Sequence, residues 1–181
     1  MYSKFDDAII TAVVCRAGQD GKIGRTVLQK IVYFLKAKGV PVRYKFDIQH
    51  YGPYSQDLYF RMDDLVAEEI VCDVSVSHSR SEYQRGPKAE MLLEEHKIAL
   101  DKYQDDTSIV LEQFNGISSE EMGLLATTHY IQCSHTIFYN APPEKNLVVR
   151  QVMKMKKRFT REQVEDAYHR LESAGVFNWL G

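Results

Sequence analysis

The chain has 181 residues, of which 44% are hydrophobic and 27% charged, and its formal net charge is −2. These values predict one globular domain with a substantial core and exclude a disordered chain. No apolar run approaches the ~20 residues of a membrane helix, and the N-terminus carries acids where a signal peptide carries bases. We therefore expect a cytoplasmic protein with no membrane partner. Its three cysteines, an odd number at wide spacing, predict buried thiols and no disulfide framework.

The front of the chain begins with two predicted helices. Apolar residues at helical spacing predict the first over 5–17 and the second over 26–38. Thr26 can cap the second helix and Gly39 can end it, and its lysines, Lys30 among them, are expected mostly toward solvent. The glycine-rich segment 18–24 between the helices lacks the Gly-Lys-Ser/Thr ending of a phosphate loop and predicts a turn.

Strands and one further helix follow. Alternating apolar residues predict a half-buried strand over 42–49, which runs into the Gly-Pro turn of Tyr51–Ser55. Ser55 is a natural N-cap for a helix over about 55–68. A second strand is predicted over 70–76. A polar hairpin tip follows it at 77–81, and a short returning strand at 82–85.

From about residue 88 the chain is predicted to be wholly helical. One helix covers about 94–114, with Ile98, Tyr103, Val110, Leu111 and Phe114 on its inner side. Capping boxes at 118–121 and 160–163 begin two more helices, the first ending near 133 and the second at Gly175. Pro142-Pro143 opens another helix, which runs to about 157. We expect an α+β, mostly helical single domain over 1–181. Its winged-helix-like front half (1–87) carries a small antiparallel sheet and packs on a helical back half (88–181).

No recognisable catalytic centre stands out. His129 and Cys133 have the i, i+4 spacing of two metal ligands on a helix, but no second pair accompanies them. Together with His135 they are expected to close a helix end. Dinucleotide-binding, kinase, deaminase and nucleophile-elbow motifs are absent from the sequence. We therefore expect no metal, no cofactor and no enzymatic activity, with an enzyme of unrecognised site as a minor alternative.

Charge is distributed in blocks. Bases prevail from Arg16 to Lys45 and again from Lys145 to Arg170, whereas acids prevail over Arg61 from Asp57 to Asp73. A helix that enters a DNA groove needs bases, so the acidic helix after Ser55 favours a basic protein partner. A protein whose own ligand is DNA is one such partner. The alternative is a winged-helix DNA-binding regulator that uses the basic helix 26–38 or the basic segment 145–170.

Two motifs carry a resemblance to known proteins. The segments Leu28-Gln29-Lys30-Ile31-Val32-Tyr33-Phe34 and Tyr51-Gly52-Pro53-Tyr54-Ser55 resemble those of small, largely uncharacterised prokaryotic proteins. They are more distantly similar to the Panacea antitoxin domain. With 123–130 and 148–176, the chain is similar to the C-terminal region of macro-domain antitoxins that restrain DNA-ADP-ribosylating toxins. In that family this region is thought to bind the toxin, and the macro domain, which this chain lacks, removes the modification.

The resemblance implies a non-enzymatic protein-binding module, antitoxin-like or defence-associated, that neutralises a DNA-modifying toxin by direct binding. The residues expected to contact the partner are Gln29, Lys30, Tyr51, Tyr54, Asp57 and Arg61. Leu28 and Tyr33 are expected in the core, while Gly52, Pro53 and Ser55 form the turn and the cap. Tyr51 and Tyr54 are expected to flank the start of the acidic helix.

Overall fold

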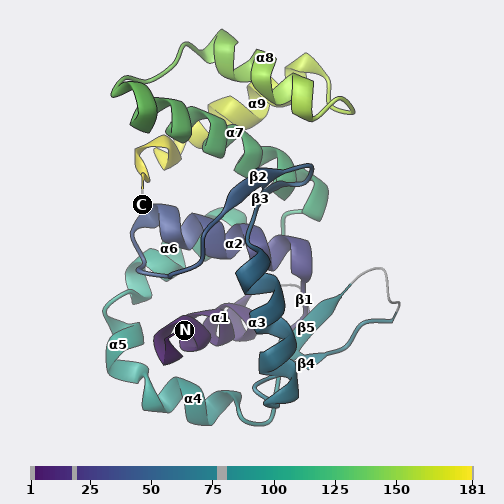
Figure 1. Cartoon of the computed structure of the whole chain (residues 1–181), viewed down its shortest axis with the longest axis vertical. Helices are drawn as coiled ribbons and strands as arrows, with labels where there is room; N and C mark the ends of the chain where they lie inside the picture. Colours follow the sequence, from purple (N-terminus) through teal and green to yellow (C-terminus); the bar gives the residue numbers. More distant parts are fainter. Residues whose placement is uncertain (1–2, 18–19, 77–80, 181) are drawn as a thin grey trace.

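The computed structural model of the chain describes residues 3–17, 20–76 and 81–180, and these form a mostly helical α+β fold, as predicted (Figure 1). The helices are α1 (Lys4–Arg16), α2 (Arg25–Lys38), α3 (Gln56–Ala67), α4 (Ala89–Glu95), α5 (Lys97–Asp101), α6 (Gln104–Phe114), α7 (Ser119–Tyr139), α8 (Lys145–Met155) and α9 (Arg161–Ser173), followed by the 3-10 turn η1 (Val176–Asn178). The strands are β1 (Ile23–Gly24), β2 (Asp47–Gln49), β3 (Gly52–Tyr54), β4 (Val71–Asp73) and β5 (Glu82–Arg85).

The strands form two small antiparallel sheets. One has the order β1-β5-β4, with Ile23 opposite Tyr83 and Cys72 opposite Gln84. The other is the hairpin of β2 and β3. In Figure 1 the three-stranded sheet lies beside α1 and α3, whereas the hairpin reaches toward α7. The hairpin therefore lies where the front of the chain meets the helices of the back.

Helix α2 lies at the centre of the core. Its apolar side chains are buried on both flanks, and one cluster of buried apolar residues extends from α1 to η1. The Phe34 ring stacks on Phe114 of α6 at 3.9 Å between centroids and meets His129 of α7 edge-on at 5.3 Å. The predicted core residues Leu28 and Tyr33 are buried. Front and back halves thus contribute to one hydrophobic cluster.

The start of α2 and the extents of the first two predicted strands differ from the predictions. Thr26 does not cap α2. Gly24 is its N-cap, because β1 pairs with β5 and runs directly into the helix. Of the predicted strand 42–49, only Asp47–Gln49 pairs, although Val42 and Tyr44 are buried in the predicted alternation. The strand predicted over 70–76 ends at Asp73. Most of the predicted hairpin tip 77–81 lies outside the described residues.

The predicted helix 94–114 is interrupted at His96 and again at 102–103, and it forms α4, α5 and α6. These breaks let α4 and α5 bend around α1 (Figure 1). Ile98, predicted to face inward, is 81% exposed, so that prediction is wrong. Val110, Leu111 and Phe114 are buried as predicted.

The last helices follow the predicted signals closely. Helix α7 extends past 133 to Tyr139, and α8 begins at Lys145 rather than at the prolines. The predicted capping box of α9 is present, and Gly175 follows its end at a φ of 67°. Across the described residues, no helix combines the length and apolarity needed to cross a membrane.

Candidate functional site

The Tyr51–Ser55 turn is the tip and returning strand of the β2–β3 hairpin. Ile48 pairs with Pro53, and Gln49 with Gly52. Gly52 has a φ of 98°, which L side chains rarely adopt. A Cβ at Gly52 would lie 2.8 Å from Thr127 Oγ1 and 3.2 Å from the Gly123 carbonyl oxygen on α7. This position therefore requires glycine for both its conformation and its close approach to α7.

Helix α2 holds the other end of the turn. The Gln29 side-chain amide donates to the Ser55 carbonyl and accepts from the Ser55 N–H, each at 2.9 Å. Lys30 Nζ donates to the Pro53 carbonyl at 2.7 Å. Both side chains are buried, and Lys30 is only 1% exposed. The prediction that Lys30 faces solvent is wrong, because α2 is packed on both flanks and the ammonium finds a carbonyl partner inside.

A second lysine holds the hairpin from the opposite side. Lys156, which follows α8, donates from Nζ to the His50 carbonyl at 2.9 Å. Burial lowers the pKa of Lys30 to about 8, with a further contribution from the charge of Lys156. Burial likewise lowers the pKa of Lys156 to about 8, helped by Arg158. In the described chain, both ammonium groups hydrogen-bond backbone carbonyls and neither pairs with a carboxylate.

We call Lys30 and Lys156 the lysine clamp. It fixes the hairpin between α2 and the end of α8. Ser55 also caps α3 as predicted, accepting from the Leu58 N–H at 3.3 Å. Gln29 and Lys30, predicted as partner contacts, are thus placed inside the protein, where they hold the backbone. Lys156 was not singled out from the sequence, and its place in a basic run was the one available signal.

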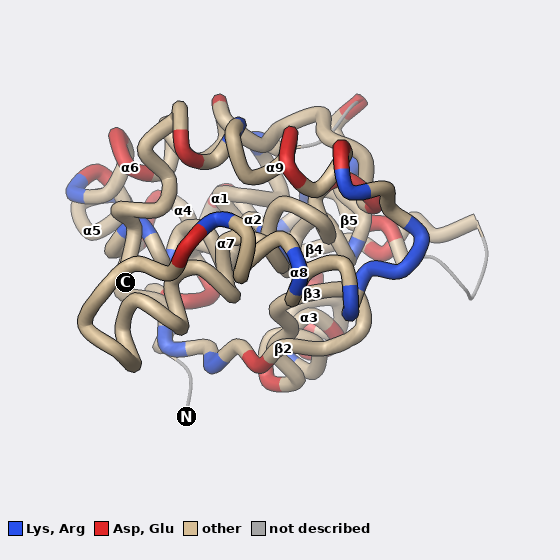
Figure 2. Tube along the Cα trace, turned by 90° about the horizontal axis from the view of Figure 1, so that it is seen from above, with Lys and Arg blue, Asp and Glu red and all other residues tan. Residues whose placement is uncertain are grey.

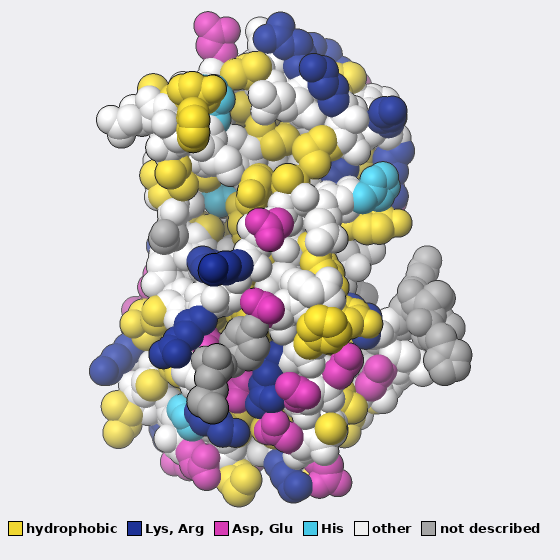
Figure 3. All heavy atoms as spheres, in the orientation of Figure 1, with side chains coloured by type: hydrophobic (Ala, Val, Ile, Leu, Met, Phe, Trp, Pro, Cys, Tyr) yellow, Lys and Arg dark blue, Asp and Glu magenta, His cyan; other side chains and the backbone are white. Residues whose placement is uncertain are grey.

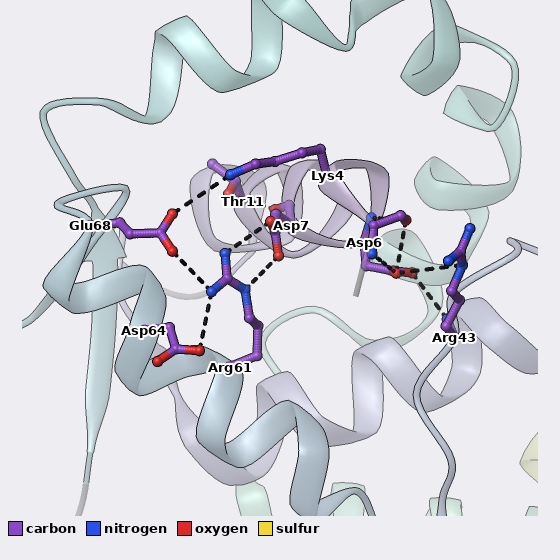
Figure 4. A network of polar contacts seen from close by, with 9 residues as sticks. Lys4, Asp6, Asp7, Thr11, Arg43, Arg61, Asp64 and Glu68 are labelled. Carbon is purple, nitrogen blue, oxygen red and sulfur yellow. Dashed lines mark hydrogen bonds and ion pairs between the residues drawn. The ribbon is translucent and has the colours of Figure 1, made fainter. Parts of the chain in front are cut away.

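Arg61, another predicted contact, ties α3 to α1. Its Nε and Nη2 donate to the two carboxylate oxygens of Asp7, at 2.7 and 3.0 Å. Its Nη1 lies 3.2 Å from Asp64 and 2.9 Å from Glu68 (Figure 4). The hydrogen bond to Asp7 raises the pKa of Arg61 above its already high value. The Arg61 side chain is 13% exposed, so its charge is largely used within the protein.

The remaining predicted contacts lie at the surface. Asp57 is exposed on α3, and Tyr54 is half-buried just before that helix. Residues three apart on a helix are neighbours, so Phe60, which is 58% exposed, lies between Asp57 and Asp63. We call Asp57, Phe60 and Asp63 the acidic–aromatic face. Figure 3 shows acidic and apolar side chains together over α3.

Phe60 was not singled out from the sequence. A detectable signal existed, because Phe60 falls outside the apolar face that Leu58, Met62 and Leu65 form on the same helix. These three are buried. An aromatic residue on the polar side of an amphipathic helix is an exposed hydrophobic group by pattern alone.

The prediction that Tyr51 flanks the start of the acidic helix α3 is wrong. It is 62% exposed and lines a hollow of about 520 Å³ between the hairpin tip and the end of α8. The residues lining this hollow are His50, Tyr51, Lys154, Met155, Lys156, Lys157 and Arg158. We call it the basic hollow. Figure 2 shows Lys and Arg gathered in one run beside α8.

A similarity to a bacterial protein extends over most of the chain. No protein-family model matches the chain. The chain is similar to the uncharacterized protein YwgA of Bacillus subtilis (strain 168), with 26% identity over 155 residues that cover 83% of this chain and 86% of the relative. The name of that relative states no activity or ligand.

His129 and Cys133 are buried within α7 and not at a helix end as predicted, and they contact the C-terminal segment. His129 Nδ1 lies 2.7 Å from the Tyr33 hydroxyl, and Nε2 lies 3.1 Å from the Val176 carbonyl oxygen. These two contacts fit a neutral imidazole, in which Nδ1 accepts a hydrogen bond from the Tyr33 hydroxyl and Nε2–H donates one to the Val176 carbonyl oxygen. Cys133 Sγ lies 3.3 Å from Nε2. Among the described residues, no group of three His, Cys, Asp or Glu side chains could hold a metal ion.

The titration of this group matches a structural role. Burial lowers the pKa of His129 to about 4 and raises the pKa of Cys133 to about 12. Near neutral pH the imidazole is therefore uncharged and the thiol protonated. A thiol needs to ionise to act as a nucleophile, so Cys133 lacks that property here.

His129 is expected to make the protein sensitive to acid. Its folded pKa of about 4 lies below the unfolded value of ~6.5, so the unfolded chain binds more protons between these values. The free energy of unfolding should fall by up to about 3 kcal/mol as the pH decreases from 6.5 to 4. Urea unfolding as a function of pH measures this slope. His129→Gln should lose it and the exposed-site control His169→Gln should keep it. An unchanged slope in H129Q contradicts the assignment.

Proposed function

We propose that the chain is a non-enzymatic protein-binding module, antitoxin-like or defence-associated, that neutralises a basic DNA-binding toxin by direct contact. The observation that carries the proposal is the acidic–aromatic face, in which the exposed Phe60 ring lies between Asp57 and Asp63. Aromatic anchors that become desolvated supply much of the binding energy of protein interfaces, and surrounding charges set specificity and association rate. A partner with an apolar pocket rimmed by Lys and Arg complements this face.

The charge of α3 is not balanced at its surface. Arg61 is the only base within α3, and it is engaged with Asp7, Asp64 and Glu68. No described ion pair involves Asp57 or Asp63. The acidic–aromatic face therefore repels phosphates and attracts basic protein surfaces. A toxin that binds DNA carries such a surface, and an acidic helix docked there would compete with the DNA.

The second candidate is a winged-helix DNA-binding regulator. The connectivity supports it: α1, β1, α2, α3, β4 and β5 follow one another, with a sheet of order β1-β5-β4 and the β2–β3 hairpin inserted between α2 and α3. In a helix-turn-helix comparison the second helix, α3, would enter the major groove. Its exposed acids disfavour that placement.

The lysines of α2, the basic helix that the DNA-binding alternative would use, are engaged in contacts within the protein. Lys30 is buried against Pro53, and Lys36 donates to the Tyr44 carbonyl at 2.7 Å. Lys38 lies 3.4 Å from Asp106 and over the Trp179 ring. The predicted solvent-facing lysines of α2 are therefore engaged within the protein, which leaves 145–170 as the basic segment available to nucleic acid.

Affinity capture from the native cell, with nuclease treatment as a control, tests the proposal. Phe60→Ala is expected to weaken binding of the captured protein at least about thirtyfold, which corresponds to the ~2 kcal/mol of a hot-spot residue. Asp57→Asn with Asp63→Asn should slow association and reduce its salt dependence. The matched control is Phe138→Ala, because Phe138 is also exposed but lies at the end of α7. Loss of capture after nuclease treatment, or equal weakening by F138A, overturns the proposal.

A further inference from the structure

The basic hollow has the size and the lining of a ligand site. Its volume of about 520 Å³ lies within the range of small-molecule pockets. Two distant parts of the chain form it, the hairpin tip with His50 and Tyr51 and the end of α8 with residues 154–158. The Lys156–His50 hydrogen bond joins these parts, so the walls are held in place by the same contact that anchors the hairpin.

The charge of the basic hollow is not neutralised locally. Its lining contains no acid. Arg158 pairs with Glu120 at 3.1 Å, but Lys154 and Lys157 are exposed and enter no described ion pair. Lys156 donates to one carbonyl, and an ammonium has three donors. The C-terminus of α8 carries roughly half a negative charge, which offsets only part of these lysines.

An aromatic ring stands beside the charges. The exposed Tyr51 ring meets the His50 ring edge-on, with centroids 4.9 Å apart. Stacking of bases on aromatic side chains and backbone contacts from lysines are the two elements of sequence-tolerant nucleic-acid binding. Tyr51 and the lysines combine both elements within one hollow.

We propose that the basic hollow binds a nucleotide, with Lys154, Lys156 and Lys157 around a phosphate and Tyr51 stacked on the base. The phosphate and base can belong to a free nucleotide or to a single strand of nucleic acid. Phosphate accepts from several ammonium donors at once, which complements three lysines that lack carboxylate partners. This inference concerns a surface separate from the acidic–aromatic face and does not depend on the proposed protein partner.

Titration of the whole chain with three probes tests the inference: inorganic phosphate, adenosine 5′-monophosphate and a ten-nucleotide single-stranded DNA. The monophosphate or the DNA should bind more tightly than phosphate alone. Binding of the monophosphate identifies a free nucleotide as a sufficient source, whereas binding of the DNA alone assigns the site to a strand. Lys154→Ala with Lys157→Ala should weaken binding at least tenfold. For the DNA, it should also reduce the slope of log K against log salt by up to about 0.7, the contribution of one neutralised phosphate of a single strand.

Matched variants separate this site from general attraction to a basic surface. Tyr51→Phe keeps the ring and should bind as the parent does, whereas Tyr51→Leu should weaken binding severalfold. Lys145→Ala changes a half-buried lysine at the other end of α8, whose Nζ lies 2.6 Å from His169 Nε2, and should leave binding unchanged. Circular dichroism confirms that each variant is folded. Absence of binding by all probes at low salt overturns the inference, as does equal weakening by K145A or equal binding by Y51L.

Discussion

Replacing Arg61 with methionine is expected to lower the free energy of unfolding by about 3 to 5 kcal/mol, the cost of leaving one member of a buried ion pair without its partner. Asp7 is 2% exposed, and its carboxylate accepts two hydrogen bonds from the guanidinium of Arg61. Methionine preserves much of the apolar stem but supplies no donor. Urea unfolding at neutral pH measures the loss.

Two variants separate the ion pair from general surface charge. Arg43→Ala removes an arginine whose side chain is 64% exposed and lies 4.0 Å from Asp6, so its cost should stay below about 1 kcal/mol. Adding Asp7→Asn to Arg61→Met should recover part of the loss, because a neutral amide is less costly to bury than an unpaired carboxylate. A cost for R61M similar to that for R43A contradicts the anchoring role.

Replacing Gly52 with alanine is expected to destabilise the fold by about 4 kcal/mol. The unfavourable φ costs ~1–3 kcal/mol, and forcing a methyl group into a filled space costs a further ~1–3 kcal/mol. That methyl group would lie 2.8 Å from Thr127 Oγ1 and 3.2 Å from the Gly123 carbonyl oxygen. Thermal and urea unfolding measure the effect.

Gly39 provides the matched control. Its φ is 109°, close to that of Gly52, but a Cβ there meets nothing within 4 Å. Gly39→Ala should therefore lower the free energy of unfolding by the conformational cost alone, about 1–2 kcal/mol. Adding Thr127→Ala to G52A should recover part of the loss by removing the nearest atom. Equal losses of unfolding free energy in G52A and G39A would contradict a steric contribution from the close approach of Gly52 to α7.

The sequence predicts the helices well where the apolar period and the caps agree. The Thr160 capping box and the Ser55 cap are present in the structure. It predicts less well where tertiary contacts decide. The helix breaks at His96, where α4 and α5 bend around α1, and no residue in 94–114 signals that bend as a proline would.

In the candidate site too, the sequence predicts the positions of some residues and fails where a tertiary contact decides. Tyr51 and Asp57 are exposed, in agreement with their polar or amphipathic character. Lys30 is buried because its partner is the Pro53 carbonyl, a backbone atom 23 residues away that no local pattern reveals. The partner of Lys156 is 106 residues away. The sequence predicts a surface position for any lysine whose buried hydrogen-bond partner is unknown.

The residues that hold the hairpin backbone are different from the exposed residues that we propose to bind a partner. Gln29, Lys30 and Gly52 act on the backbone of the hairpin, inside the protein. A related chain can keep them and still exchange Phe60 or Tyr51 without disturbing the clamp. Proteins that share the Leu-Gln-Lys and Tyr-Gly-Pro-Tyr-Ser segments are therefore expected to share a scaffold, while their binding preferences diverge at the exposed positions around it.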